Sequence, residues 1–406
     1  MIRSLQSLVA MVVIAAALAA ASSASAAHVQ CGDVITQDTT LDSDLEGCPN
    51  DGLVIGADGV TVDLNGHEIS GPGGGPGYGG GSGANGIYGN SNDGVDDSAG
   101  YDRLVVKGGE IELFDSGVKL RDVQGASVTG LEIYAASFGV LLVESDRNRI
   151  DANDIYQTGY GIYPVESSDN RIARNLLHAN TFGMYPVESN HNVIVRNTVT
   201  GSSILGIQVT TGSSDNRISE NEILGNASTG LLVSNAYRNV LTRNVVVDHS
   251  FAGISLNDAD GSVVRHNRVA NETLGPLAGP FGVGILALVE SDWMTIADNT
   301  VAGYRTGFRV GGSRGVALSR NVARDNQIDG LWVENGAPQT LVNANRSEGN
   351  GDDGIDVEDG SARVRKNRAN FNGDLGIEAA PGVDGGGNRA SGNGNPAQCV
   401  GVTCGN

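Results

Sequence analysis

The sequence predicts an all-β fold, a parallel β-helix of about 12 coils in which each coil spans 22 to 24 residues. A glycine followed by an apolar residue returns at this period, and an asparagine returns in phase with it. After each glycine the apolar residues alternate, as in Ile207 and Val209, which is the periodicity of a β-strand. Because no window keeps a helical spacing, helical repeats and leucine-rich repeats with a helix are disfavoured.

The glycine row marks one turn in each coil, where a residue without a side chain can adopt the conformation that the bend requires. Its steps are 22 to 24 residues, except for one step of 31 that indicates a loop insertion at 273–282. The members are Gly117, Gly139, Gly161, Gly183, Gly206, Gly230, Gly253, Gly284, Gly307, Gly330, Gly354 and Gly376.

The asparagine row has a structural interpretation. An inward amide side chain can bond the amide of the next coil, and Asn tolerates a left-handed turn between strands. Apolar residues lie three positions before each Asn and two positions after most of them. The row comprises Asn153, Asn175, Asn197, Asn221, Asn244, Asn267, Asn299, Asn321, Asn345 and Asn367. Stacked coils about 4.8 Å apart would form a rod of roughly 55–60 Å before its caps.

The two ends of the chain indicate export. Arg3, an apolar run at 8–21 and the small residues at 24–26 predict a cleaved signal peptide over 1–26. That run is short for a membrane span, and no later segment approaches 18 apolar residues, so we expect no transmembrane span. The expected location is extracellular or periplasmic.

Four cysteines fit that compartment. They permit three pairings, but two local couples at opposite ends of a solenoid favour Cys31 with Cys48 and Cys399 with Cys404. The predicted organisation is a signal peptide at 1–26, an N-terminal cap at 27–57, a β-helix at 58–390 with insertions near 71–83, 90–101 and 273–282, and a C-terminal tail at 391–406.

The charge limits the partners. The net charge is −21, and −22 once Arg3 leaves with the signal peptide. Such a chain should repel nucleic acid and anionic membranes. It should also repel a polyanionic polysaccharide, unless a cation or a local basic stripe intervenes.

The repeated pattern N-x-[IV] followed by G-[IV]-x-[VL], with the segment 58–71, resembles the right-handed parallel β-helix repeats of the pectin-lyase-like superfamily. The NosD-type periplasmic proteins are the most similar subset. The resemblance covers roughly residues 52 to 390 and implies the fold. That superfamily includes lyases, hydrolases, epimerases, adhesins and proteins without known chemistry, so the resemblance does not select a function.

Outward residues of three near-identical coils are the candidates for a site. The residue two past each glycine points outward, and this column contains Lys119, Tyr163, Tyr185 and Gln208. A second column places Glu144, Glu166 and Glu188 on one line, where a Ca²⁺ ion could offset their repulsion. Solvated surface is the alternative for these glutamates.

The resemblance implies β-elimination or epimerisation of a uronate polysaccharide for some relatives. In that hypothesis the tyrosines stack on sugar rings, and Lys119 or a Tyr phenolate removes a proton. Stabilising or protonating groups, and groups that bind the substrate, would be Arg121, Arg174, Arg196, His191 and Gln208. For the arginines before the Asn row, charge pairing along the solenoid is the alternative interpretation.

Named activities lack their motifs. The sequence has no Arg-x-Pro-x-x-Arg of pectate lyases, no Asp-Pro-His-Glu of alginate epimerases and no Gly-His-Gly of polygalacturonases. A non-catalytic structural or adhesive solenoid is therefore the alternative to a polysaccharide-binding or polysaccharide-processing protein. Metal delivery, by analogy with NosD-type proteins, is the least favoured, because six His and four Met are scattered along the chain.

Overall fold

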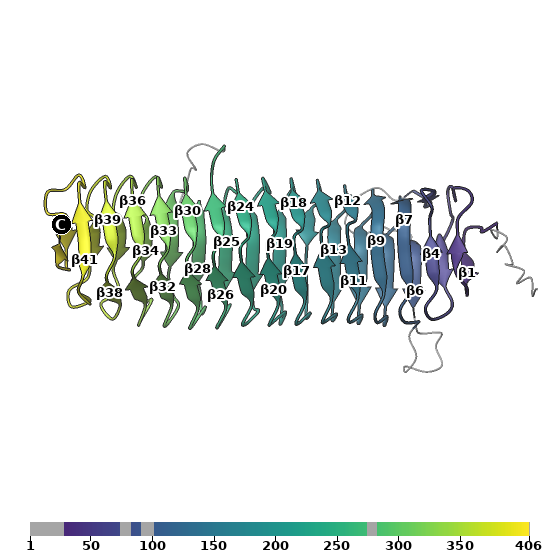
Figure 1. The fold of residues 1–406 in the computed structure, drawn as a ribbon, viewed down its shortest axis with the longest axis horizontal. Helices are drawn as coiled ribbons and strands as arrows, with labels where there is room; N and C mark the ends of the chain where they lie inside the picture. Colours follow the sequence, from purple (N-terminus) through teal and green to yellow (C-terminus); the bar gives the residue numbers. More distant parts are fainter. Residues whose placement is uncertain (1–27, 74–82, 91–100, 274–281, 406) are drawn as a thin grey trace, which may run out of the picture.

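The structure is a computed structural model, and it describes residues 28–73, 83–90, 101–273 and 282–405. The predicted signal peptide lies outside these residues, as do most of the three predicted loop insertions. The strands stack along one long axis, from the purple N-terminal coils to the yellow C-terminal coils (Figure 1). No helix among the described residues is long and apolar enough to cross a membrane.

One face of the solenoid is a sixteen-stranded parallel sheet, here sheet A, which corresponds to about 15 turns. Its strands in spatial order are β1 (Asp33–Ile35), β3 (Leu53–Ile55), β6 (Asn85–Asn90), β8 (Ser116–Arg121), β10 (Phe138–Val143), β13 (Tyr160–Val165), β16 (Phe182–Met184), β19 (Leu205–Thr210), β22 (Thr229–Ser234), β25 (Ala252–Asn257), β28 (Val283–Leu288), β31 (Thr306–Val310), β34 (Leu331–Val333), β37 (Ile355–Val357), β40 (Ile377–Ala379) and β42 (Cys399–Val400).

The remaining strands form sheet B, which runs as two parallel strips joined at their N-terminal end by the long strands β7 (Val105–Glu112) and β9 (Ser127–Tyr134). The first strip continues with β2 (Thr39–Thr40), β4 (Thr61–Asp63), β11 (Arg149–Asp151), β14 (Arg171–Ala173), β17 (Val193–Val195), β20 (Arg217–Ser219), β23 (Val240–Thr242), β26 (Val263–Arg265), β29 (Thr295–Ala297), β32 (Ala317–Ser319), β35 (Leu341–Asn343) and β38 (Arg363–Arg365).

The second strip contains β5 (Glu68–Ser70), β12 (Asp154–Tyr156), β15 (Leu176–His178), β18 (Thr198–Thr200), β21 (Glu222–Leu224), β24 (Val245–Val247), β27 (Arg268–Ala270), β30 (Thr300–Ala302), β33 (Val322–Arg324), β36 (Arg346–Glu348), β39 (Arg368–Asn370), β41 (Asn388–Ser391) and β43 (Cys404–Gly405). Each coil therefore contributes one strand to each of three faces, around a core of buried Ile, Val and Leu.

The solenoid has more coils than the glycine row counted. Gly52, directly before β3, and Gly86, within β6, are in register with the row, but insertions after each of them hide the period. Gly32 precedes β1 at the same position but is followed by Asp33, and β42 has Gln398 there. The sheets consequently extend beyond the predicted limits of 58–390, since cap and tail strands pair in register with their neighbours.

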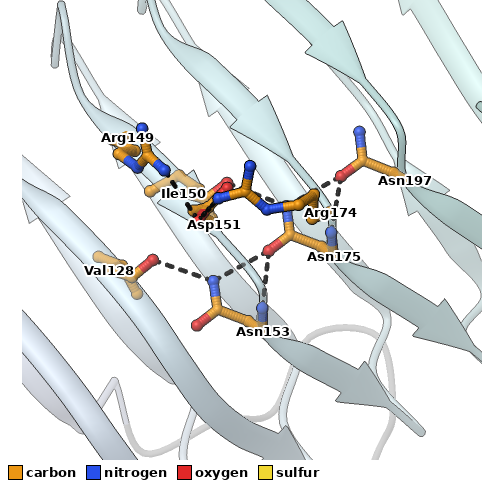
Figure 2. Close-up of polar contacts among 8 residues, drawn as sticks. All are labelled: Val128, Arg149, Ile150, Asp151, Asn153, Arg174, Asn175 and Asn197. Carbon is orange, nitrogen blue, oxygen red and sulfur yellow. Dashed lines mark hydrogen bonds and ion pairs between the residues drawn. The ribbon is translucent and has the colours of Figure 1, made fainter. Parts of the chain in front are cut away.

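The predicted asparagine ladder is confirmed. The Asn153 N–H donates to Asn175 Oδ1 at 3.0 Å, and its Nδ2 donates to Val128 O at 3.1 Å and to Asn175 Oδ1 at 3.0 Å (Figure 2). Asn175 repeats the pattern toward Asn197. One correction concerns the turn: the residue before each Asn takes the left-handed conformation, as at Arg174 (φ 56°), because the Asn itself turns inward.

Two further ladders occupy the other corners of the coil, and the sequence analysis missed both. Buried residues five positions before and after the predicted row make the same bonds, as Asn170 and Asn180 do beside Asn175. A bend buries backbone groups wherever it occurs, so each corner needs the same polar partner.

The predicted disulfides are confirmed. Cys31 bonds to Cys48 near the N-terminal end of the solenoid, and Cys399 bonds to Cys404 near the C-terminal end. Both are consistent with an extracellular or periplasmic location, where disulfides persist.

Candidate functional site

The outer face of sheet A presents the predicted column in register. Lys119 pairs with Leu141, which pairs with Tyr163 in the next coil. Gln208 lies on β19 and donates to the hydroxyl oxygen of Tyr185 at 3.3 Å. The structure therefore places four of the predicted site residues, Lys119, Tyr163, Tyr185 and Gln208, in one outward column, with Leu141 between Lys119 and Tyr163.

A second outward row, which the sequence analysis missed, completes an aromatic cluster here. Phe138, Tyr160 and Phe182 directly precede the glycines, and that repeated position was the available signal. Tyr160 stacks on Phe182 at 5.0 Å between centroids and on Tyr163 at 4.8 Å. Tyr185 instead meets Tyr163 edge-on, with 73° between the ring planes.

This packing limits what the aromatic cluster can do. The stacked rings cover one another's faces, which leaves mostly edges for a sugar to contact. Burial also raises the pKa of both Tyr163 and Tyr185, which disfavours a phenolate base at neutral pH. The rings are therefore first a stabilising ladder of the solenoid.

Glu144, Glu166 and Glu188 are exposed at the turn that follows each strand. All three have a left-handed backbone, with φ of 50°, 49° and 49°. The Glu144 N–H donates to Val165 O at 3.0 Å in the next coil, so the backbone here serves the turn. The Ca²⁺ site at these side chains stays a prediction.

Arg174 and Arg196 lie on another side of the solenoid, at the corner between the two strips of sheet B. Arg174 and Arg149 both pair with Asp151, whose side chain is only 6% exposed (Figure 2). Arg196 pairs with Glu220 at 2.8 Å. These pairs agree with the charge-pairing interpretation, and the structure does not bring the two arginines to the tyrosines of sheet A.

Arg121 and His191 lie at the margin of sheet A. Arg121 ends β8, the strand that carries Lys119, and is exposed. His191 occupies a left-handed turn between sheet A and sheet B, with φ of 55°. The Lys119 ammonium lies 5.4 Å from the centroid of the Tyr88 ring, a cation–π contact.

A different region of sheet A has the most unusual electrostatics in the described chain. Four strands align one outward row in register, formed by Arg309, Trp332, Asp356 and Glu378. The Arg309 guanidinium lies over the Trp332 ring, 4.6 Å from its centroid. Arg309 pairs with Glu334, and Trp332 Nε1 donates to Glu358 at 3.2 Å.

Three carboxyl groups in this region hold their protons unusually well. Burial is the largest cause, and neighbouring carboxylates such as Glu378 add to it. The pKa of Asp329 is raised to about 6, that of Asp353 to about 7 and that of Asp356 to about 7. Asp353 is 5% exposed and accepts the Leu375 N–H at 2.8 Å.

Two clefts adjoin this row. One, of about 290 Å³, is lined by Arg305, Thr306, Arg309, Ile328, Asp329 and Trp332. The other, of about 330 Å³, is lined by Asp356, Val357, Glu358, Glu378, Ala379 and Ala380. One carboxyl group with a raised pKa therefore lines each cleft: Asp329 lines the first together with Trp332, and Asp356 lines the second together with Glu378. Such groups in a cleft are what acid–base chemistry requires.

Arg309, Trp332 and Asp356 also lie two positions past a glycine of the row, and the sequence analysis did not select them as site candidates. The signal it passed over was the replacement of apolar outward residues by acids in consecutive coils, at 352–358 and at Glu378. The raised pKa values of Asp329, Asp353 and Asp356 could not be predicted from the sequence, because these values depend on burial by adjacent coils.

One group of carboxylates could hold a metal ion. In the part of the chain that the structure describes, Asp352, Asp353 and Asp374 form the only set of three whose ligand atoms all lie within 4.8 Å of one another. Carboxylate oxygens suit hard cations such as Ca²⁺. No histidine or cysteine joins this set.

Two family models match the chain. The family described as periplasmic copper-binding protein (NosD) matches residues 96–275. The model described as right handed beta helix region matches residues 206–371 and 277–405. A comparison with curated proteins finds no match.

Solved structures share the fold at low identity. A double mutant of the periplasmic alginate epimerase AlgG is 16% identical with a TM-score of 0.50, over 72% of this chain and 77% of that one. The A-module of the Azotobacter vinelandii mannuronan C-5 epimerase AlgE4 is 14% identical with a TM-score of 0.50, over 78% and 85%. These likenesses show the architecture.

Proposed function

We propose that this right-handed parallel β-helix protein binds a polysaccharide on sheet A and hydrolyses the polymer at the carboxyl groups beside Trp332. One observation carries the proposal: Asp329 and Asp356, whose pKa values are raised to about 6 and about 7, each line a cleft on the outer face. Polysaccharide-acting proteins among the structural neighbours support a carbohydrate partner.

The proposed reaction uses two carboxyl groups in adjacent coils. Asp356, as the acid, gives its proton to the glycosidic oxygen while the bond from that oxygen to the anomeric carbon breaks. The exposed Glu378 carboxylate bonds to the anomeric carbon as that bond breaks, because in-register carboxyl groups of adjacent coils lie too close to admit a water molecule between them. The Asp356 carboxylate then takes a proton from a water molecule, whose oxygen bonds to the anomeric carbon and displaces Glu378. Trp332 supplies an apolar surface for a neighbouring sugar ring. General acid catalysis at neutral pH requires a carboxyl group that is protonated at that pH, and the raised pKa of Asp356 meets this requirement.

Incubation with a panel of neutral and uronate polysaccharides tests the proposal. New reducing ends in the absence of unsaturated ends are the expected result. Unsaturated ends, followed by their absorbance, would instead support the lyase chemistry predicted around Lys119. No product with any polymer would contradict hydrolysis and favour the non-catalytic structural or adhesive alternative.

Copper binding, which the name of one matching family suggests, does not fit the residues present. In residues 28–73, 83–90, 101–273 and 282–405, Met184 and Met294 are fully buried in the core, and the four cysteines form disulfides. Copper favours imidazole and sulfur ligands, whereas the one close ligand set is formed by aspartates.

A further inference from the structure

The corner that leads from sheet A to the first strip of sheet B carries an aromatic cleft. It has a volume of about 420 Å³ and is lined by Tyr237, Arg238, Asp260, Gly261 and Trp293. Tyr237, Asp260 and Asp292 occupy the same position in three consecutive coils. The N–H of the residue after Tyr237 donates to Asp260 O, and the N–H of the residue after Asp260 donates to Asp292 O. The cleft is separate from the clefts beside Trp332.

Tyr237 interrupts a polar ladder at this corner. In other coils the side chain at this position accepts the N–H of the next coil, as Ser168 does from Asn190 and Asp260 does from Asp292. The Tyr237 hydroxyl instead donates to Asp258 Oδ2 at 3.3 Å. A residue that breaks a repeated local rule is a candidate for function.

Trp293 is a large exposed aromatic residue in the same cleft. It is 59% exposed, and its φ of 55° is the left-handed corner conformation that Arg238 and Gly261 share in the preceding coils. A Cβ at Gly315 would lie 2.3 Å from Trp293 Cε3, so the glycine of the next coil makes room for the ring. Arg314 lies 5.5 Å from the ring centroid.

Gly261 leaves a gap between the two aromatic residues. It lies in the coil between them, and a Cβ there would touch only the Arg238 side chain, at 3.4 Å. Two coil spacings amount to about 10 Å. A sugar ring in van der Waals contact with an aromatic side chain on each side needs two contacts of about 3.5–4 Å. The cleft of about 420 Å³ that these residues line has room for one sugar ring.

The charges select among sugars. Asp258 raises the pKa of the Tyr237 hydroxyl, with smaller contributions from Asp260 and Glu290, so the rim is negative. Two guanidinium groups lie nearby. Arg238 is engaged by Asp215 through two bonds of 2.9 and 2.6 Å, and Arg314 lies against the Trp293 ring and donates to Gln339 Oε1 at 3.2 Å. A uronate would be repelled, whereas the hydroxyls of a neutral sugar can donate to the carboxylates.

We propose that Tyr237, Gly261 and Trp293 form a sugar-binding clamp that takes one neutral pyranose ring of a polysaccharide. The inference rests on the proposed function in assuming a carbohydrate partner, and it adds the class of sugar and a binding site away from the reacting groups.

Tryptophan fluorescence tests the clamp directly, because the chain has only two tryptophans, Trp293 and Trp332. In a Trp332→Phe variant the emission reports on Trp293 alone. Titration with laminarihexaose, cellohexaose and mannohexaose should give a saturable change with at least one of them. A hexamer of mannuronate should give none. No response to any neutral hexamer, or a stronger response to the uronate, would overturn the clamp.

Gly261→Asn in the Trp332→Phe background is the decisive variant. Asn tolerates the left-handed turn (φ 65° at Gly261) and would fill the gap while keeping both aromatic residues. Binding should weaken at least tenfold. Phe371→Ala is the matched control, since Phe371 is another exposed aromatic residue in a left-handed turn (68%, φ 58°). Equal binding by the Gly261→Asn variant would contradict the proposal.

The fluorescence titration and the reducing-end assay distinguish a failure of the sugar-binding clamp from a failure of the proposed hydrolysis. Fluorescence changes without reducing ends from any polymer would leave the clamp standing and contradict hydrolysis. Reducing ends produced by the wild-type chain, without a fluorescence change in the Trp332→Phe variant, would leave hydrolysis standing and overturn the clamp.

Discussion

Two regions of sheet A use the same outward positions for opposite purposes. Around Tyr160 the rows hold rings that stack on one another across coils. Around Asp356 the same rows hold carboxyl groups whose charges repel. Stacked rings stabilise the solenoid, whereas crowded carboxyls destabilise it and raise one another's pKa. A stabilising cluster needs no function to explain it, and a destabilising one does.

The largest expected effect separates the two regions by activity. Asp356→Asn removes the proposed acid with little change of shape, and we expect a loss of about 10²–10⁴ in the rate of reducing-end formation. Asp325→Asn, an exposed acid at another corner, is the control and should retain full rate. An Asp356→Asn variant with wild-type activity would remove this carboxyl from the mechanism.

The pH dependence of kcat/KM sharpens the comparison. The acid must be protonated, and the pKa of Asp356 is raised to about 7. Activity should therefore fall about tenfold per pH unit above 7, because the protonated fraction falls by that factor. Initial rates from pH 5 to 9 would show this limb. A rate that is flat from pH 6 to 9 would exclude Asp356 as the acid.

A pair of aromatic truncations distinguishes packing from binding. Tyr160→Ala should lower the free energy of unfolding by about 1–3 kcal/mol, since it removes a ring from the stack. Trp332→Ala should weaken polysaccharide binding severalfold, with a smaller loss of stability. Chemical denaturation and binding titrations on both variants measure this. The reverse pattern would show that the roles of the two regions have been exchanged.

The smallest effect concerns stability and pH. Asp353 and Asp356 have folded-state pKa values of about 7, above the unfolded value of about 4. The folded state therefore binds protons more tightly, and stability should fall as pH rises from about 4 through 7. We expect a Tm several degrees lower at pH 8 than at pH 5. Asp356→Asn should reduce the difference, whereas Asp325→Asn should leave it unchanged.

The sequence by itself determined the repeating coil, its apolar core and its two disulfide bonds. The Gly and Asn rows and the alternating apolar residues follow from the backbone geometry of each turn, which repeats along the chain, and the cysteine couples are local. It also predicted that Lys119, Tyr163, Tyr185 and Gln208 share one face, because they hold the same position in each coil.

Only the tertiary structure decided which rows of side chains lie in contact and how neighbouring groups change their charge pairing and pKa. Arg174 looked like part of a basic stripe, but it neutralises the buried Asp151. The pKa of Asp356 is raised to about 7 because adjacent coils desolvate its carboxyl group. Tyr237 and Trp293 meet across one glycine although 56 residues separate them in the sequence. Burial and contact between coils are properties of the stacked solenoid, and no single coil of the sequence contains them.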